Sequence, residues 1–324
     1  MRTLPLIPSL LALASALALT GGCDPAVDVG RDPAVSFRPF TCSWCTTIGN
    51  GPIVNNASLA GVNLKGVNSA GIKVMGVYVG KSGYYTLAVD PDTEGFLGVN
   101  LNDQDDALEG RGFVGAKIVL QMDGGALVYL EITDMDDAVA SWSKYGGDVV
   151  AYKAMYVDQG IQKSLCPSAN PENQWFTLIA DELYDPDTHQ ITQADDVFTI
   201  ACVGEAAAKL KLLDYHPRGS HESTPEERAA TLRMITADYC GDGTSFTVQG
   251  VHVGWRDAAD TVEPPYGEDL LEAKWGPEGA LCLNTPREVE LDAVLDHCEI
   301  PSCGDSLDFD GAVWRTMLPA DADG

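Results

Sequence analysis

The stretch at residues 224–243 most constrains the fold, because it contains both the start and the stop of one helix. Thr224 is a favourable N-cap, Pro225 suits the first helical position, and Glu227 completes a capping box three residues after the cap. Two glycines closely follow Cys240 and are expected to end the helix. The sequence thus predicts a helix over residues 224–239 that leads into a covalent anchor point. Its apolar residues recur at helical spacing and should dock it on a core: Ala229, Leu232, Ile235 and Tyr239.

The chain contains nine cysteines, of which eight remain for disulfide bonds if Cys23 belongs to an export signal. An exported chain meets oxidising conditions, where an even set of cysteines is expected to pair. Eight cysteines allow about a hundred pairings, which sequence alone cannot separate. We expect neighbours to pair, with Cys282 as the preferred partner at the end of the helix: Cys42–Cys45, Cys166–Cys202, Cys240–Cys282 and Cys298–Cys303.

Cys42 and Cys45 are separated by two residues, a spacing that also occurs in redox motifs and in zinc sites. A redox motif needs a helix N-terminus beside the thiol, and a zinc site needs a second pair of ligands at similar spacing. Neither context is visible in the sequence. We therefore favour a disulfide over redox chemistry at this pair.

Residues 1–22 are predicted to be a lipoprotein signal peptide. Arg2 provides the charged start, and the apolar segment at residues 4–19 is shorter than the about 20 residues that span a bilayer. Small residues directly precede Cys23, which we expect to become the acylated N-terminus, while ordinary cleavage that leaves Cys23 free is the alternative. Residues 23–41 then form a tether. This predicts an exported protein of a Gram-negative bacterium, anchored to a membrane by lipid and facing the periplasm or the cell surface.

Residues 42–83 are predicted to form a small N-terminal β appendage. Glycine recurs every fifth residue within it, at positions 61, 66, 71 and 76. This period resembles pentapeptide repeats, which wind into a square β-solenoid, but four units make only about one coil. The alternative is a glycine-rich β segment that packs on the main domain.

Residues 84–304 are expected to form one domain, followed by an acidic tail at 305–324. Residues 116–122 and 126–132 flank an Asp-Gly-Gly turn and predict a β-hairpin. Further strands are expected at 148–157, 175–179 and 197–202, before helices at 205–213 and 224–239. The predicted fold class is therefore α+β and β-rich. Antiparallel strands precede two short helices, a short pentapeptide-like β appendage lies at the N-terminus, and disulfides stabilise the whole.

The run Ala237-Asp238-Tyr239-Cys240 resembles the signature of the ADYC-domain family of bacterial envelope proteins. Residues 198–202, 240–244 and 275–280 also fit that family, and the resemblance covers most of residues 107–304. Family members have two helix cysteines at the places that Leu210 and Thr231 occupy here, which implies that a helix–helix disulfide is missing. The family has no established activity, so the resemblance implies a location rather than a function.

The formal net charge is −28. Such a surface repels phosphate backbones, so nucleic acid is not expected as a partner. Carboxylates at this density usually form a solvated surface, but Asp90, Asp92 and Glu94 also have the opening spacing of a calcium loop. Leu101 stands where an EF-hand needs a bidentate carboxylate, which excludes that motif. We expect no cofactor, with one structural calcium ion as the alternative.

Asp238 and Asp242 flank the signature cysteine and are the only catalytic candidates, as a carboxylate pair. The alternative, which we favour, is that Asp238 bonds nearby backbone or an arginine, while Asp242 forms a turn. The expected function is a non-catalytic envelope module that presents a surface to protein partners, glycans or cell-wall material. An extracytoplasmic hydrolase centred on the two aspartates and a calcium-dependent surface-binding protein remain alternatives.

Overall fold

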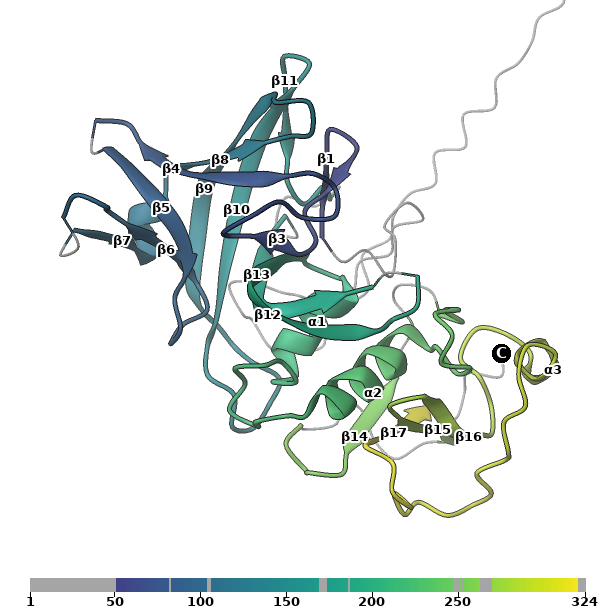
Figure 1. Cartoon of the computed structure of the whole chain (residues 1–324). Helices are drawn as coiled ribbons and strands as arrows, with labels where there is room; N and C mark the ends of the chain where they lie inside the picture. The colour runs from purple at the N-terminus through teal and green to yellow at the C-terminus, as the bar shows by residue number, and fades with distance from the viewer. Residues whose placement is uncertain are drawn as a thin grey trace, which may run out of the picture.

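Antiparallel strands make up most of the fold, as the sequence predicted, and they form a large sheet and two small ones (Figure 1). The computed structural model describes residues 51–319, apart from 82, 104–105, 169–173, 186, 248–250, 252 and 263–269. The lipidation candidate Cys23 and the pair Cys42–Cys45 lie outside these residues. No helix within the described ranges is long and apolar enough to cross a membrane.

The large sheet has eleven strands and curls around an apolar interior. Its order is β3-β13-β12-β10-β9-β8-β4-β5-β6-β7, with β11 paired to β10. Phe96 on β6 packs against Phe198 on β13, although these strands lie near opposite ends of the order, so the sheet must curl. The strands are β3 (Val62–Asn63), β4 (Lys73–Val79), β5 (Gly83–Val89), β6 (Phe96–Val99), β7 (Ala107–Glu109), β8 (Lys117–Gln121), β9 (Leu127–Val139), β10 (Val149–Asp158), β11 (Ile161–Ser164), β12 (Phe176–Tyr184) and β13 (Ile191–Cys202), with a short 3-10 helix, η1 (Gly110–Phe113).

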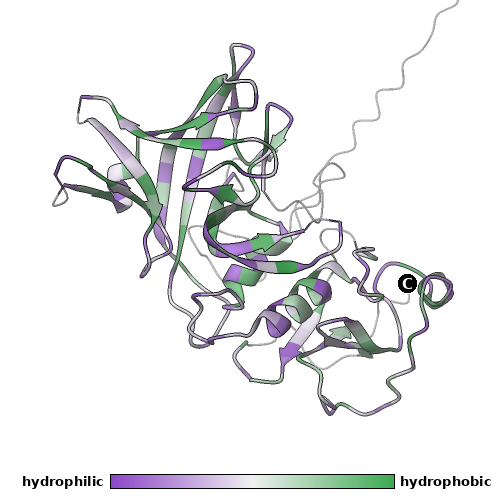
Figure 2. Ribbon diagram, in the orientation of Figure 1, coloured by the Kyte–Doolittle hydropathy of each residue, from purple (hydrophilic) through white to green (hydrophobic). Residues whose placement is uncertain are grey.

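The predicted hairpin at 116–132 is confirmed as β8 and β9, joined by the Asp-Gly-Gly turn. Buried and exposed residues alternate along β9, and Figure 2 shows hydrophobic and hydrophilic positions alternating on the same strand. The buried positions face the sheet core, which we define as the apolar cluster inside the large sheet. One face of β9 therefore contributes to this core, while β10 and β12 are buried on their other face as well.

The glycine-rich segment packs on the large sheet, which corresponds to the second of the two interpretations above. β1 (Ile53–Val54) and β2 (Ala57–Ser58) form a hairpin, and β3 pairs with β13. The side chain of Asn68 donates to the carbonyl oxygens of Ser58 and Ala60, and its oxygen accepts from the N–H of Ile72. This amide holds the turns of the segment together. β4 pairs with both β5 and β8 inside the sheet, so no break in the sheet occurs at residue 83.

Two helices lie between the large sheet and a four-stranded sheet (Figure 1). α1 (Ala206–Leu212) packs on β12, and α2 (Pro225–Thr236) packs on β15. The small sheet has the order β14-β17-β15-β16, with β14 (Gly254–Asp257), β15 (Leu270–Gly276), β16 (Gly279–Leu283) and β17 (Trp314–Leu318). β17 and the short α3 (Leu291–Leu295) were not predicted, and β17 is an inner strand drawn from the acidic tail. The buried residues around α1 and α2 form a second cluster, the helix core.

The capping box at the start of α2 is confirmed. Thr224 Oγ1 accepts from the N–H of Glu227, and the Glu227 carboxylate accepts from the N–H of Thr224. The predicted end is wrong, because the helix stops at Thr236 and not at the glycines. Ala237 has φ 51° and ψ 42°, the left-handed conformation that ends many helices. Tyr239 therefore lies beyond the helix.

Candidate functional site

Three disulfides join the described cysteines, and only one of them has the predicted pairing. Cys166–Cys202 agrees with the prediction. Cys240 pairs with Cys298 and not with Cys282, while Cys282 pairs with Cys303. The pairing of β15 with β16 explains the difference, because it places Cys282 opposite Lys274. The chain segments that the two bonds close overlap, because Cys282 lies between Cys240 and Cys298 in the sequence. Pairing each cysteine with its neighbour in sequence cannot predict such an arrangement.

Asp238 is completely buried and joins two loops. Its Oδ2 lies 2.9 Å from His189 Nδ1 and accepts from the N–H of Gly243 at 3.0 Å. Arg233 Nε lies 3.7 Å from the same oxygen. Asp238 thus bonds to backbone and to charged side chains in the interior, as the favoured alternative expected.

Tyr239 belongs to a second buried network. Its hydroxyl donates to Glu272 Oε1 at 2.5 Å and accepts from the N–H of Arg287 at 3.0 Å. Arg287 in turn donates to both carboxylate oxygens of Glu272, at 2.7 and 3.0 Å. The Tyr239 ring stacks on Trp275, with centroids 5.1 Å apart. Burial raises the pKa of Tyr239 well above its usual value, so this hydroxyl stays protonated.

The glycines that follow the signature cysteine permit close backbone contact. Gly241 and Gly243 have φ values of 71° and 92°. A Cβ at Gly241 would lie 1.8 Å from the carbonyl oxygen of Glu278, and one at Gly243 would lie 1.7 Å from that of Asp187. Only glycine fits either position. Residues 237–243, the ADYC segment, are therefore held by helix α2, by two neighbouring loops and by a disulfide.

Asp242 does not form a carboxylate pair with Asp238. It is half exposed, and its Oδ2 lies 2.8 Å from His297 Nε2. Thr244 Oγ1 lies 3.2 Å from the same nitrogen. A hydrolytic triad places nucleophile and carboxylate on opposite ring nitrogens, so these contacts do not form one. The N–H of Thr244 and then His297 lower the pKa of Asp242, which keeps it ionised.

Residues 110–289, more than half of the chain, match the ADYC domain. The chain belongs to the ADYC-domain family. None of the curated proteins and none of the solved structures matches it. In this ADYC domain each letter of the signature has a structural place. Ala237 ends the helix, Asp238 and Tyr239 anchor two buried networks, and Cys240 forms a disulfide.

The three calcium candidates do not converge. Asp90 Oδ1 accepts from the N–H groups of Asp92 and Thr93 and so stabilises its own turn. Glu94 points inward, where its Oε2 bonds to Lys211 Nζ and lies 3.0 Å from His216 Nδ1. The Glu94 side chain is therefore turned away from the Asp90 turn and is bound by Lys211 in the interior. Among the described residues no group of three side chains is arranged to hold a metal ion.

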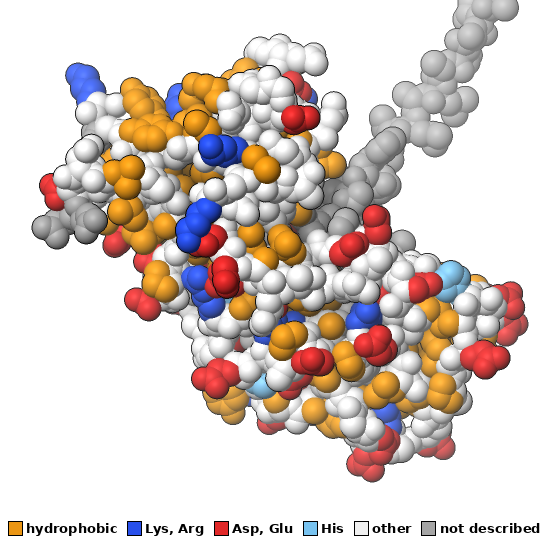
Figure 3. Space-filling view, viewed as in Figure 1, with side chains coloured by type: hydrophobic (Ala, Val, Ile, Leu, Met, Phe, Trp, Pro, Cys, Tyr) orange, Lys and Arg blue, Asp and Glu red, His pale blue; other side chains and the backbone are white. Residues whose placement is uncertain are grey.

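An exposed aromatic surface lies on the outer side of the large sheet, partly within the ADYC domain and partly on strands that precede it. Tyr78 on β4 is directly opposite Tyr84 on β5, and Val119 on β8 is opposite Tyr129 on β9. Figure 3 shows hydrophobic side chains gathered over this part of the sheet, while acidic ones are more frequent over the lower part of the view. We call this surface the tyrosine face, and its residues line a hollow of about 360 Å³: Met75, Tyr78, Tyr84, Val119, Leu127 and Tyr129.

The tyrosine face has one ring fixed by a hydrogen bond and a balanced ion pair at its rim. Its three tyrosines are each about half exposed, while Val119 is buried and forms the floor. The Tyr84 hydroxyl donates to the carbonyl oxygen of Met75, which fixes that ring on the sheet. Lys117 and Glu131, one cross-strand position further on, form an ion pair at 3.3 Å.

Sequence reasoning missed both buried networks and the tyrosine face. A glutamate inside the apolar strand segment Leu271-Glu272-Ala273 was the one signal for the Tyr239 network, since a buried carboxylate needs a partner. His189 and Arg287 lie in loops and had no such signal. The tyrosines occupy outward positions of three strands, and only the pairing of those strands brings them together.

Proposed function

We propose that this protein is an exported, lipid-anchored protein of a bacterial envelope, and that it binds polysaccharide as a non-catalytic module. The signal at residues 1–22, followed by Cys23, supports export and lipidation. Three disulfides support an oxidising compartment. The enclosed position of Asp238 and the shared contact at His297 Nε2 support a non-catalytic role.

The tyrosine face is the observation that carries the binding role. A folded protein exposes a contiguous apolar surface mainly where it binds something. The hollow of about 360 Å³ is shallow and open, so a ligand would lie across the rings rather than be enclosed. The Tyr84 ring, which its hydrogen bond already fixes, loses little conformational entropy on binding. These properties suit a ligand that lies flat across the strands.

Sugar rings match this surface in chemistry. A pyranose ring has an apolar C–H face that packs on an aromatic ring, and hydroxyl groups around its edge. The tyrosine rings offer the flat apolar partner, and their hydroxyls together with the Lys117–Glu131 pair offer donors and acceptors at the rim. The net charge of −28 disfavours acidic polymers, so we expect chains of neutral or N-acetylated sugars.

Binding to insoluble polymers of glucose and of N-acetylglucosamine, including purified cell-wall sacculi, tests the ligand. The wild type should be depleted from solution by at least one of them. A Tyr78→Ala, Tyr129→Ala double variant should bind about tenfold more weakly, because each aromatic contact contributes about 0.5–1.5 kcal/mol. Tyr145→Ala is the matched control, since Tyr145 is an exposed tyrosine away from the face.

Equal loss in the control and the double variant would place binding elsewhere on the surface. Failure of the wild type to bind any of these polymers would reject the ligand class. The anchor is tested separately, by Cys23→Ala. This variant should leave the membrane fraction, whereas unchanged fractionation would refute lipidation of Cys23.

A further inference from the structure

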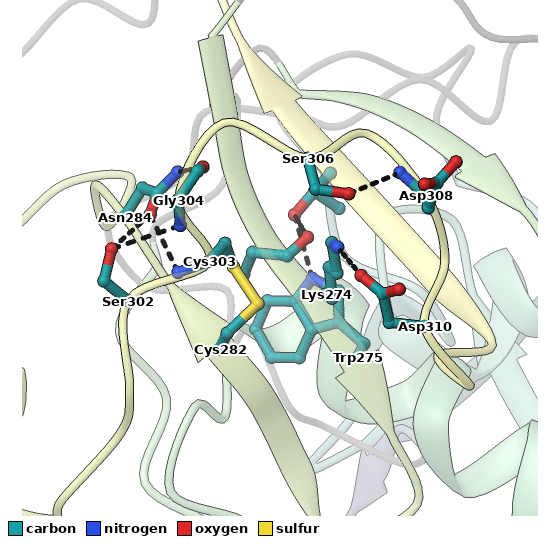
Figure 4. Close-up of a disulfide and its surroundings, with 12 residues drawn as sticks. Lys274, Trp275, Cys282, Asn284, Ser302, Cys303, Gly304, Ser306, Asp308 and Asp310 are labelled. Carbon is teal, nitrogen blue, oxygen red and sulfur yellow. Dashed lines mark hydrogen bonds and ion pairs between the residues drawn. A yellow bond between two sulfur atoms is a disulfide. The ribbon is translucent and has the colours of Figure 1, made fainter.

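The Cys282–Cys303 disulfide lies at the surface of the helix-core region, unlike the bond in the sheet core. Cys282 is on the edge strand β16, and Cys303 is in the segment that leads to β17 (Figure 4). Both cysteines line a polar hollow of about 260 Å³, together with Lys274, Ser302 and Asp310. By contrast, Cys166 and Cys202 are buried among apolar residues of the sheet core. A dissolved thiol can therefore reach the first bond far more easily than the second.

Lys274 lines the same hollow as Cys282, and its amine is ion-paired with Asp310. The two residues are direct cross-strand partners in the β15–β16 hairpin, so their side chains project from the same side of it. The Lys274 side chain is 4% exposed, whereas its partner Asp310 is 63% exposed. Water thus screens the carboxylate much more than the ammonium. The local field favours a negative charge on Cys282 if the bond opens.

Asn284 holds the Cys303 loop without using the disulfide. Its side-chain oxygen accepts from the N–H of Cys303 at 2.9 Å and from Ser302 Oγ at 3.0 Å. Its side-chain nitrogen donates to the carbonyl oxygen of Gly304 at 2.9 Å. These three bonds surround the cysteine in Figure 4. They would keep the two sulfurs near each other after reduction, so that the bond can close again.

We propose that Cys282–Cys303 is a thiol–disulfide exchange site whose partner is a dithiol, such as the paired cysteines of a reductase. A thiolate of the dithiol attacks Cys303 Sγ and forms a mixed disulfide, while the electron pair of the broken bond goes to Cys282 Sγ. Lys274 stabilises that leaving thiolate. The second thiolate of the dithiol then attacks the first dithiol sulfur, which is bonded to Cys303 in the mixed disulfide. This releases Cys303 as a thiolate, which takes a proton from water. The protein gains two electrons, and the dithiol becomes a disulfide.

Opening this bond has a local consequence. It removes the closure of the chain between Cys282 and Cys303, which contains α3, while Cys240–Cys298 still ties α3 to the ADYC segment. The Asn284 contacts, the Lys274–Asp310 ion pair and the hydrogen bond from Arg315 to the carbonyl oxygen of Leu307 then still hold the segment before β17. The exchange site thus adjusts the rigidity of one surface without dismantling the helix core.

Graded reduction of the oxidised full-length protein with dithiothreitol, followed by alkylation and peptide mass spectrometry, tests the site. We expect Cys282 and Cys303 to be alkylated first and Cys166 and Cys202 last. Lys274→Gln should slow the opening severalfold, because the leaving thiolate loses its ammonium. Asp310→Asn should speed it, because the same ammonium loses its counter-charge. Asp310 is exposed, so this second variant is expected to fold even if Lys274→Gln does not.

Two results would overturn the proposal. The first is the opening of Cys240–Cys298 or Cys166–Cys202 before Cys282–Cys303. The second is an Asp310→Asn rate equal to or below that of the wild type, since a merely accessible disulfide would not respond to the charge on Lys274. Recovery of the Cys282–Cys303 bond on addition of an oxidised dithiol should be complete if Asn284 holds the loop in place, and scrambled bonds after this step would also contradict the proposal.

Discussion

The sheet core and the helix core are stabilised in different ways. In the sheet core, Phe96 packs on Phe113, Tyr152 and Phe198, and the cluster is almost entirely apolar. The helix core is surrounded by buried charges, including the pairs Arg228–Glu182 and Arg287–Glu272. Apolar burial stabilises without direction, whereas a buried ion pair requires one geometry. The comparison indicates that single substitutions in the sheet core lower the free energy of unfolding by small amounts. Loss of one specific contact of the ADYC segment should lower it by much more.

Several of the buried charges join the two regions. Glu94 precedes β6 in the large sheet and pairs with Lys211 on α1. Glu182 on β12 pairs with Arg228 on α2, and Tyr184 donates to its other oxygen at 2.8 Å. The helices are therefore positioned on the sheet by ion pairs as well as by the burial of apolar surface. This explains why the two cores form one structure although their interiors differ.

Tryptophan fluorescence separates the two regions experimentally. Every tryptophan in the described part of the chain lies in the helix core or packs against it: Trp142, Trp175, Trp255, Trp275 and Trp314. The sheet core contains none among its described members. Apart from Trp44, which lies outside the described residues, fluorescence thus reports on the helix core. Amide hydrogen exchange on β8 and β9 reports on the sheet core.

The largest expected effect is at Arg287. Arg287→Met leaves the buried Glu272 carboxylate unpaired and should lower the free energy of unfolding by about 3–5 kcal/mol. The fluorescence transition in urea should move to lower concentration. Combining it with Glu272→Met should recover more than half of the loss, because both charges are then absent. A double variant less stable than the single one would contradict this account.

The matched change in the sheet core is Ile132→Val, at a fully buried position. It removes one methylene and should cost about 0.5–1.5 kcal/mol, with no partner left unpaired. If Arg287→Met costs no more than this, the contrast between the two cores is wrong.

The next effect concerns the Cys240–Cys298 disulfide. Its sequence separation is 58 residues, for which chain entropy predicts a loss of about 4 kcal/mol when both cysteines become alanine. Cys166–Cys202, with a separation of 36, should cost nearly as much by the same argument. The two losses should appear in different measurements. Removing Cys240–Cys298 should move the fluorescence transition to lower urea concentration, and removing Cys166–Cys202 should reduce the amide protection of the sheet. Equal response of both probes to both changes would show that the regions unfold as one unit.

A smaller effect is expected on acidification. Burial, and then the nearby Lys211, lower the pKa of His216 well below its usual value of 6.5, and they outweigh the Asp214 carboxylate, which lies 3.6 Å from His216 Nε2. Below about pH 6.5 the unfolded chain therefore binds a proton that the folded chain does not, so stability falls as the pH decreases. Amide protection in α1 should fall between about pH 7.5 and pH 5 while that in β9 changes less. His216→Gln should remove the difference, and an unchanged pH profile in that variant would exclude His216 as its source.

Local signals in the sequence predicted much of the fold. The capping box and the Asp-Gly-Gly hairpin each depend on a few neighbouring residues, and both are confirmed. The Cys166–Cys202 bond, predicted by pairing consecutive cysteines, is confirmed as well. β17 was missed because the acidic, small-residue composition before it resembles a tail. Its inner place depends on pairing with β14 and β15, which are distant in sequence.

The candidate site was harder to predict. Asp238 was identified, but His189 lies 49 residues before it, and nothing in the sequence joins the two. The other two disulfide pairings depend on the register of β16 and on α3, neither of which had a clear local signal. Long-range contacts between buried charges are what the sequence pattern leaves open, and the ADYC segment consists largely of such contacts.

The smallest expected effect concerns residues in the left-handed backbone conformation, one set in the β8–β9 turn and one residue at the end of α2. In the β8–β9 turn the sheet uses glycines, with φ values of 85° and 87° at Gly124 and Gly125. The helix core instead places Ala237 at φ 51°. For an L-residue this conformation costs about 1–2 kcal/mol, so Ala237→Gly relieves strain while losing a buried methyl contribution of about 0.8 kcal/mol and gaining unfolded-state entropy. The net change in the free energy of unfolding should be within about 0.5 kcal/mol of zero.

Ala230→Gly is the matched control, because Ala230 is equally buried but lies inside α2. It loses the same methyl group without relieving strain, and should cost about 1–2 kcal/mol. Urea unfolding followed by fluorescence measures both variants. Equal losses would mean that Ala237 is not strained in solution, and that the first letter of the signature is kept for packing alone. A markedly smaller loss at Ala237 would mean that strain is stored at the residue where α2 ends, whereas the β8–β9 turn places glycines at its left-handed positions.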